Sequence, residues 1–288
     1  MAPTLTAGAI PALAADETTP GLKTLYLTID LDNGASKTTA VYIPNTFAAV
    51  SPVNMLIYFH GHKGMLGSVS LMGMSIQQYL KVKEFKLREF AKAASAGNFV
   101  LVVPTLGDGS GAGLLTRSAA NFDAYLDQIL EGIAEHHLKP KGKPVLDHII
   151  LSAHSGGGAA MLSIATNSLS STSPTSNKIR EIWCFDCTYG GGSAWMKWVE
   201  SPAHTLDRMW LYSTGSWTKD DGKRTGTGDD TKVLSDFATK KKRSNIEVSI
   251  PSSGVSVNWS YPPGKFGHNE CVGTFMTLLI DSSNNLAF

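Results

Sequence analysis

Residues 149–158 read Ile-Ile-Leu-Ser-Ala-His-Ser-Gly-Gly-Gly. The apolar, strand-like part of this stretch stops at Ser155, and three glycines follow at once. A strand that turns sharply into a helix holds a serine hydroxyl clear of the backbone, where a neighbouring base can activate it. The turn needs small residues two positions before and after the serine, and here they are Ala153 and Gly157. The stretch predicts a nucleophilic serine in an A-x-S-x-G motif; a glycine-rich loop after a strand is the alternative interpretation.

Strand-like and helix-like segments alternate on both sides of this turn. Helices are expected at residues 75–96, 117–138, directly after 155, and at 193–200, 230–241 and 270–280. Strands are expected at residues 22–31, 39–44, 55–59, 98–104, 148–153, 181–186, 208–213 and 245–250. The first two strands form an antiparallel pair, and the later alternation indicates parallel strands joined by crossover helices. We therefore expect an α/β fold, a three-layer α/β/α sandwich with Ser155 at the carboxyl edge of a mostly parallel sheet.

The composition argues against two classes of protein, those that bind nucleic acid and those that span a membrane. The chain has 288 residues, of which 17% are charged, and its formal net charge is +1, so nucleic acid is not an expected partner. No apolar run approaches the roughly 18 residues that span a bilayer, and we expect a soluble protein, either cytoplasmic or secreted with most of its signal absent from this chain. Residues 1–20 are expected to form a loose arm before a single catalytic domain at 21–288. The oligomeric state is left open.

A nucleophilic serine needs a base, and His268 is the expected one. It is the one histidine after the last predicted strand, in a loop just before the final helix. A loop at that place can bring an imidazole to the serine, and the chain order serine, acid, histidine fits such a site.

The carboxylate that orients the base has three candidates. Asp186 ends an apolar strand next to the serine strand, where an aspartate is costly to bury without a partner. Asp221 and Asp220 are the alternatives, because they are the first acids beyond the strand at 208–213. A structural role for Asp186, capping the turn that follows its strand, also stays open.

Donors for an oxyanion are expected from two backbone amides. One lies just past His60-Gly61, at the end of the strand at 55–59, and the other belongs to Gly156.

These residues together resemble the α/β-hydrolase superfamily over nearly the whole chain from about Leu22. The resemblance implies an eight-stranded, mostly parallel sheet and ester hydrolysis through an acyl-enzyme. It implies Ser155 as nucleophile, His268 as base and acid, Asp186 as its orienter, and the amides of His62 and Gly156 as the oxyanion hole. Two departures from the family pattern are Ala153, in place of the usual glycine, and an acid on the earlier strand. A serine peptidase or amidase, or a hydrolase-fold binding module without catalysis, are the alternative functions.

The three cysteines and the tryptophans give further expectations. If the triad is right, Cys187 and Cys271 approach each other and a disulfide between them would fasten the acid loop to the histidine loop; two free thiols are the alternative. The cysteines are too scattered for a zinc site, and no metal or cofactor is expected. Trp217 and Trp259 lie in predicted loops and are candidates to line the pocket of a small or medium-sized ester.

Overall fold

The central element of the protein is one sheet of ten strands, in the order β1-β2-β3-β7-β4-β8-β9-β10-β13-β14. The computed structural model describes residues 4–34, 37–47, 52–63, 65–66, 69–83, 85–87, 98–107, 109–139, 142–169, 172–204, 207–261 and 265–284. The strands of the sheet are β1 (Ala12–Thr19), β2 (Leu22–Thr28), β3 (Thr38–Pro44), β4 (Val53–Phe59), β7 (Phe99–Pro104), β8 (Leu146–His154), β9 (Ile179–Phe185), β10 (Arg208–Tyr212), β13 (Ile246–Ile250) and β14 (Val255–Val257).

The six inner strands from β7 to β13 pair in parallel, and the outer strands pair antiparallel. This confirms the predicted α/β class and the early antiparallel pair, β2 with β3. The expectation of eight strands is wrong, because the sheet has two additional strands, β1 and β14, one at each edge. Both are hard to recognise in the sequence, since β14 has three residues and most residues of β1 are exposed.

Strand β1 also corrects the expectation of a loose arm at residues 1–20. Residues 12–19 pair with β2 along its whole length, with a bulge between Leu13 and Ala15. Backbone hydrogen bonds hold this strand in place, while side chains such as Asp16 and Thr18 face solvent or lie half-buried. The residues of β1 therefore lack the alternation of apolar and polar side chains from which a strand is predicted. A single catalytic domain at residues 21–288 remains a prediction, but the sheet itself continues across residue 20.

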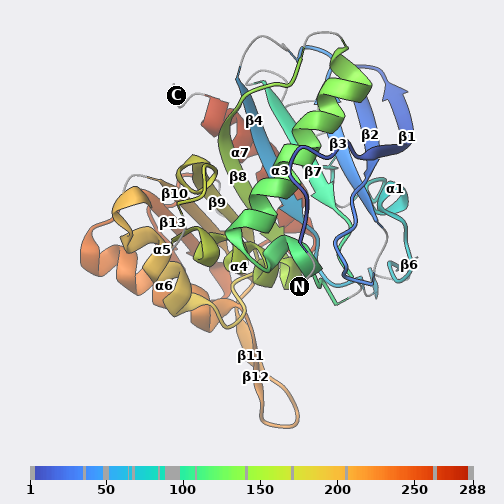
Figure 1. Cartoon of the computed structure of the whole chain (residues 1–288). Helices are drawn as coiled ribbons and strands as arrows, with labels where there is room; N and C mark the ends of the chain where they lie inside the picture. The colour runs from blue at the N-terminus through green and yellow to red at the C-terminus, as the bar shows by residue number, and fades with distance from the viewer. Residues whose placement is uncertain are drawn as a thin grey trace.

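Helices cover both faces of the sheet (Figure 1). In the described part of the chain, the helices with defined bounds are α1 (Ile76–Tyr79), α3 (Ala119–Ile133), α4 (Gly158–Leu169), α5 (Gly192–Glu200), α6 (Gly228–Lys241) and α7 (Glu270–Asn284). Short 3₁₀ turns lie at Gly113–Thr116, Ser155–Gly157, Ser176–Lys178, Pro202–His204 and Pro251–Ser253, and a π-helical turn lies at Ala134–Leu138. Two small hairpins, β5 (Met65–Leu66) with β6 (Val69–Ser70) and β11 (Ser216–Thr218) with β12 (Arg224–Gly226), stand apart from the sheet.

The helix expected at residues 75–96 is interrupted after Tyr79, and Leu87 is helical again. A capping box between Ser75 and Gln78 starts its first part, α1. Turns follow, and Lys86 has a φ of 48°, which an α-helix does not accommodate. Residues 88–97 lie outside the described part of the chain.

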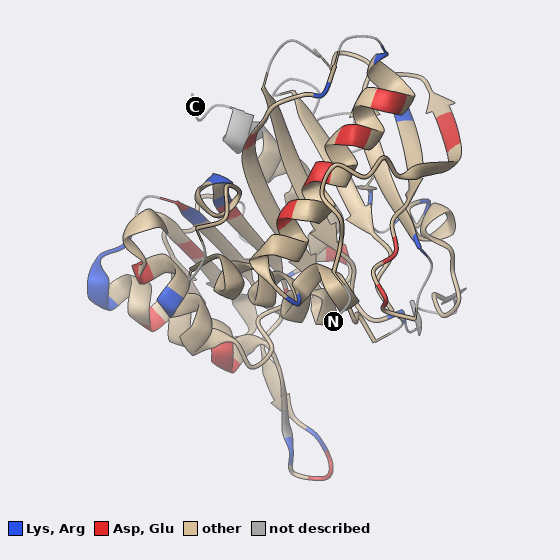
Figure 2. Ribbon diagram, viewed as in Figure 1, with Lys and Arg blue, Asp and Glu red and all other residues tan. Residues whose placement is uncertain are grey.

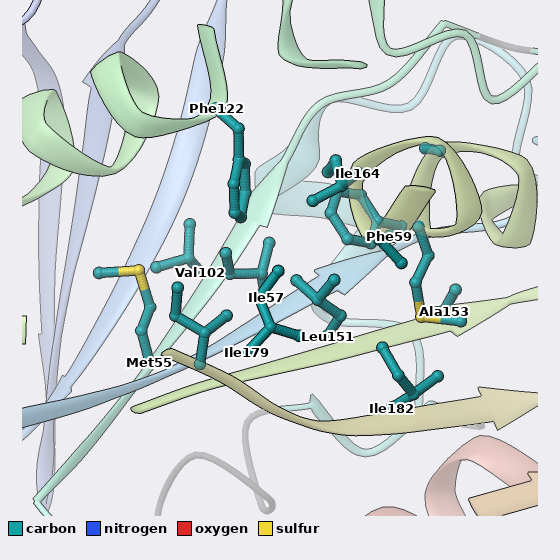
Figure 3. Close-up of a cluster of buried hydrophobic side chains, with 14 of the residues drawn as sticks. Met55, Ile57, Phe59, Val102, Phe122, Leu151, Ala153, Ile164, Ile179 and Ile182 are labelled. Atoms are coloured by element: carbon teal, nitrogen blue, oxygen red, sulfur yellow. The ribbon is translucent and has the colours of Figure 1, made fainter. Parts of the chain in front are cut away.

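Side chains of the sheet alternate between two apolar clusters, as expected for strands covered on both faces. In β4, Met55, Ile57 and Phe59 enter one cluster, and Leu56 and Tyr58 enter the other. Figure 3 shows part of the first cluster, which helices α3 to α6 cover. Helices α1 and α7 cover the second. These two layers fix the sheet, and with it the loops at the carboxyl ends of its strands. Among the described residues, every helix is too short or too polar to cross a bilayer.

Candidate active site

Ser155 lies at the sharp turn that the sequence predicts, between β8 and α4. Its φ is 51°, in the left-handed region that non-glycine residues rarely occupy, and a 3₁₀ turn over Ser155–Gly157 leads into the helix. A Cβ at Gly157 would overlap the carbonyl oxygen of Phe59, so the close approach of β4 requires glycine there. Ala153 is fully buried in the core, where its one methyl fits. An unusual backbone angle at a turn of this kind is typical of functional positions.

The turn after β4 packs directly against Ser155. A Cβ at Gly61 would lie only 2.7 Å from the Cβ of Ser155, so the absence of a side chain at Gly61 allows this contact. The imidazole of His62 lies over Gly156. The two segments that the sequence proposes as the oxyanion donors are therefore neighbours in space.

His60 fixes the shape of this turn. Its ring is buried, and the backbone N–H of Leu106 donates to its Nε2 at 2.9 Å. Nδ1 therefore carries the proton and donates to the carbonyl of Gly61 at 2.8 Å. Since carbonyl and N–H point in opposite directions across a planar trans peptide, this bond also orients the N–H of His62.

Asp186 and His268 form a close pair. Nδ1 of His268 lies 2.6 Å from Oδ2 of Asp186, and the Asp186 side chain is buried. Asp186 directly follows β9, the parallel neighbour of β8, and has a φ of 53°. The carboxyl ends of these two strands thus bring Ser155 and the Asp186–His268 pair to the same edge of the sheet.

Two threonines hold the Asp186 carboxylate from the other side. Thr214 donates its backbone N–H to Oδ1 at 3.1 Å and its hydroxyl to Oδ2 at 2.5 Å, and the hydroxyl of Thr227 donates to Oδ1. Burial, the largest effect, raises the pKa of Asp186, but the hydrogen bonds from His268, Thr214 and Thr227 outweigh it and lower the pKa below its ordinary value. Asp186 is thus held as a carboxylate, the form that can orient an imidazolium.

The alternative acids lie elsewhere. Asp220 and Asp221 are exposed at the tip of the β11–β12 hairpin, and Asp221 accepts a hydrogen bond from the backbone of Lys223 and pairs with its ammonium at 3.7 Å. Nδ1 of His268 is engaged with Asp186 instead.

His154 supports the histidine loop. Its ring is buried and lies against Phe85. Its Nε2–H donates to the backbone carbonyl of His268 at 2.8 Å. Burial, chiefly, and the nearby His268 lower the pKa of His154 to about 3, which keeps its ring neutral. Neither this bond nor the bond between Leu106 and His60 can be inferred from the sequence, because each joins segments that are distant in the chain.

A cavity of about 720 Å³ opens beside the serine. Tyr189, which the sequence analysis did not select, lies on its wall next to Ser155. Burial, foremost, and the negative charge of Asp186 raise the pKa of the Tyr189 phenol against the opposing effect of a hydrogen bond with Ser155. The wall also includes His62, Gly156, Lys219 and Thr225. Trp259, a candidate pocket residue, is not among the described residues that line this cavity, and it stacks on the buried Trp210 at 4.8 Å.

The cysteine pairing differs from the expectation. The disulfide joins Cys184 to Cys187, and Cys271 is a free, buried thiol that donates to the carbonyl of His268. The predicted Cys187–Cys271 bond is therefore wrong, and so is the alternative of free thiols at both of those positions. The physical reason is local: Asp186 leaves β9 with a left-handed backbone, which turns Cys187 back toward Cys184. The disulfide thus encloses Asp186 in a four-residue loop.

Comparison with solved structures places this arrangement in a known fold. The S-formylglutathione hydrolase of Agrobacterium tumefaciens superposes with a TM-score of 0.53 over 94% of this chain and 98% of its own, at 12% sequence identity. A glucuronoyl esterase from Solibacter usitatus gives a TM-score of 0.46, with 97% of this chain and 88% of that chain covered, at 10% identity. The sequence matches no protein-family model and no curated protein. The strand order, the serine turn and the first of these superpositions agree: the chain has the α/β-hydrolase fold.

Proposed function

We propose that the protein is a serine hydrolase that cleaves carboxylic esters through an acyl-enzyme, with Ser155, His268 and Asp186 as its triad. The observation that carries the proposal is the 2.6 Å bond between Nδ1 of His268 and buried Asp186, at the sheet edge where Ser155 leaves β8. A bond at Nδ1 leaves Nε2 of His268 as the nitrogen that serves the serine.

The first half of the reaction forms the acyl-enzyme. Oγ of Ser155 attacks the ester carbonyl carbon while its proton passes to Nε2 of His268, and the carbonyl oxygen becomes an oxyanion. The oxyanion then reforms the carbonyl, the bond to the leaving alkoxide breaks, and the alkoxide takes the proton from His268. Asp186 stabilises the imidazolium that exists between these steps, and its lowered pKa keeps it ionised for that role.

The second half releases the acid. Water gives a proton to Nε2 of His268 and attacks the acyl carbon; the tetrahedral intermediate then expels Ser155, which recovers that proton. No group beyond water and the triad is needed for the atoms to balance.

The amides of His62 and Gly156 are the proposed donors to the oxyanion. Support comes from the packing of the two turns against each other and from His60, whose bond to the Gly61 carbonyl orients the His62 N–H. Donors fixed before the reaction cost no reorganisation when the charge develops, which is the source of their effect on the rate.

The cavity favours a small or medium-sized ester. Its volume of about 720 Å³ lies within the range of small-molecule sites, and glycine, alanine, serine and threonine make up most of its described wall.

Hydrolysis of 4-nitrophenyl acetate and butyrate tests the proposal. Wild type should turn over both, and Ser155→Ala should lose about a thousandfold or more in kcat. Ser163→Ala is the matched control, because Ser163 lines the same cavity but its hydroxyl donates to the carbonyl of Ala159. A matched 4-nitroanilide separates an esterase from an amidase. Absence of any turnover would contradict the proposal and favour a binding module, whereas equal turnover by Ser155→Ala would contradict the assignment of Ser155 as the nucleophile.

A further inference from the structure

The β11–β12 hairpin is the most prominent feature outside the layers of the fold. Figure 1 shows it projecting from the body of the protein. Its base is anchored at the proposed triad, since Thr214 and Thr227, which hold Asp186, flank its two strands. The hairpin therefore leaves the body beside the proposed reaction centre, where the remainder of a bound ester would extend.

One face of the hairpin is turned toward the cavity. Trp217 pairs with Thr225 across the two strands, and directly opposed residues of an antiparallel pair share a face. Lys219 lies two residues beyond Trp217 and so on that same face. Both Lys219 and Thr225 line the cavity that also holds Ser155. Trp217 is 53% exposed, with its ring over Gly226.

Among the described residues, the charge along this cavity is positive. The described part of the wall has no aspartate or glutamate, and Lys219 is its one lysine; Asp108 and the side chain of Arg224 lie outside the described part. The described ion pairs include none for Lys219, whereas its neighbour Lys223 pairs with Asp221 at 3.7 Å. Figure 2 shows charges of both signs near the tip of the hairpin. The ammonium of Lys219 is therefore available to a ligand in the cavity, while that of Lys223 is engaged at the tip.

Hydroxyl groups complete the polar part of the wall. Ser110, Thr116 and Thr225 lie along the same cavity as Lys219. The Ser110 hydroxyl is buried and has no hydrogen-bond partner within the described structure, and Ser110 has a φ of 60°. A buried hydroxyl without a partner is costly unless a ligand or water bonds to it, so this wall is suited to a polar group.

We propose that the ester substrate carries a carboxylate in addition to its ester, and that Lys219 binds this carboxylate. The inference rests on the proposed function, because it places the ester carbonyl at Ser155 and the second group along the cavity toward the hairpin. The carboxylate belongs either to the acid half or to the alcohol half of the ester. Because Lys219 is exposed, its ion pair with the substrate is partly screened by water and salt, so the expected preference is about two- to fivefold.

Two pairs of esters test this preference. On the acid side, 4-nitrophenyl hydrogen glutarate is compared with neutral 4-nitrophenyl valerate; on the alcohol side, 4-acetoxybenzoate is compared with 4-acetoxybenzamide. Wild type should show about two- to fivefold higher kcat/KM for the carboxylate member of at least one pair, mainly through KM. Lys219→Gln should reduce that ratio to about one, and Lys219→Glu should reverse it. Lys223→Gln, on the same hairpin, is the matched control and should retain the wild-type ratio.

The dependence of the charge preference on ionic strength tests the proposed ion pair between Lys219 and the substrate independently. Raising the ionic strength from 20 mM to 500 mM should reduce the charge preference of wild type and leave that of Lys219→Gln unchanged, because screening acts only on charged pairs. Equal rates within both ester pairs in wild type, or a preference that Lys219→Gln retains, would overturn the proposal.

Turnover of the neutral esters separates this proposal from the one on which it rests. The neutral esters lack the carboxylate that Lys219 is proposed to bind, so their turnover reports on the proposed triad. Lys223→Gln, which lies outside the described cavity wall, should hydrolyse 4-nitrophenyl valerate at the wild-type rate. If wild type hydrolyses the neutral esters without any charge preference, the triad proposal stands and the carboxylate proposal fails. If wild type hydrolyses neither kind of ester, the proposed function itself fails.

Discussion

The imidazole of His268 and the carboxylate of Asp186 are separated by 82 positions in the chain, yet Nδ1 of the one lies 2.6 Å from Oδ2 of the other. Asp186 also accepts hydrogen bonds from Thr214 and Thr227, so its geometry is fixed independently of the histidine. A carboxylate held in this way orients the ring and selects its tautomer before any substrate binds.

Replacement of that carboxylate should abolish most of the activity. Asp186→Asn keeps the shape of the side chain but favours the wrong imidazole tautomer, and it should lower kcat by about a thousand- to ten-thousandfold on 4-nitrophenyl acetate. Asp221→Asn is the control and should retain the wild-type rate, because Asp221 pairs with Lys223 at the tip of the hairpin. A severe loss in Asp221→Asn with activity intact in Asp186→Asn would assign the acid to the hairpin instead.

Gly61 should be sensitive to the smallest enlargement. An added Cβ lies 2.7 Å from the Cβ of Ser155, closer than two such carbons approach, so Gly61→Ala must displace the serine or the turn. Displacement of a reacting group by about 1 Å costs on the order of a hundredfold, which is the loss of kcat expected. Gly111→Ala is the matched control on the same cavity wall, since its Cβ meets no heavy atom within 4 Å. Similar kcat values for the two variants would show that the contact at Gly61 has no catalytic consequence.

His154 should make the fold sensitive to acid. Burial, chiefly, and the nearby His268 lower its pKa from 6.5 to about 3, whereas the unfolded chain protonates this ring near its ordinary value. The contribution of this ring to stability is therefore complete above pH 6.5 and is lost progressively as the pH falls toward 3, by at most about 1.4 kcal/mol per pH unit. His154→Gln retains a donor for the His268 carbonyl and should flatten this dependence. Urea unfolding between pH 7 and pH 4 measures it, and identical slopes in the two proteins would refute the assignment.

The disulfide should support the acid loop. Reduction of the Cys184–Cys187 bond opens a four-residue loop, for which chain entropy gives a loss of about 2 kcal/mol in the free energy of unfolding. Because the loop contains Asp186, kcat should fall as well. The control is the double variant Cys184→Ala/Cys187→Ala, whose stability and activity should not respond to the reductant. Alkylation of the unfolded, unreduced protein should modify Cys271 alone, and modification of all three cysteines would disprove the bond.

The parts of the site that could be predicted from the sequence are those with a local signal. Ser155 follows an apolar strand and precedes three glycines, and the structure gives it the sharp turn that this pattern predicts. The sequence favours Asp186 because an acid at the end of a buried strand needs a partner, and the structure pairs it with His268. Their catalytic roles remain predictions until they are tested.

The remaining features depend on contacts that no local pattern encodes. A threonine such as Thr227 is unremarkable in the sequence, and its bond to Asp186 exists only because the hairpin returns to the sheet edge. The residues of β1 are mostly exposed, so their pairing with β2 leaves no apolar period to detect. The disulfide joins Cys187 to Cys184 because the left-handed backbone at Asp186, which the residue types around it do not predict, turns Cys187 back toward Cys184.

The most direct test of the central claim is to map the site of a covalent fluorophosphonate adduct. The probe reacts with a serine only where a base activates it and an oxyanion site stabilises the adduct. Wild type should gain one adduct, on the peptide that contains Ser155, while His268→Ala should label far more slowly and Ser155→Ala not at all. An adduct on another residue, or no adduct on a folded wild-type protein, would contradict the assignment of Ser155 as the nucleophile.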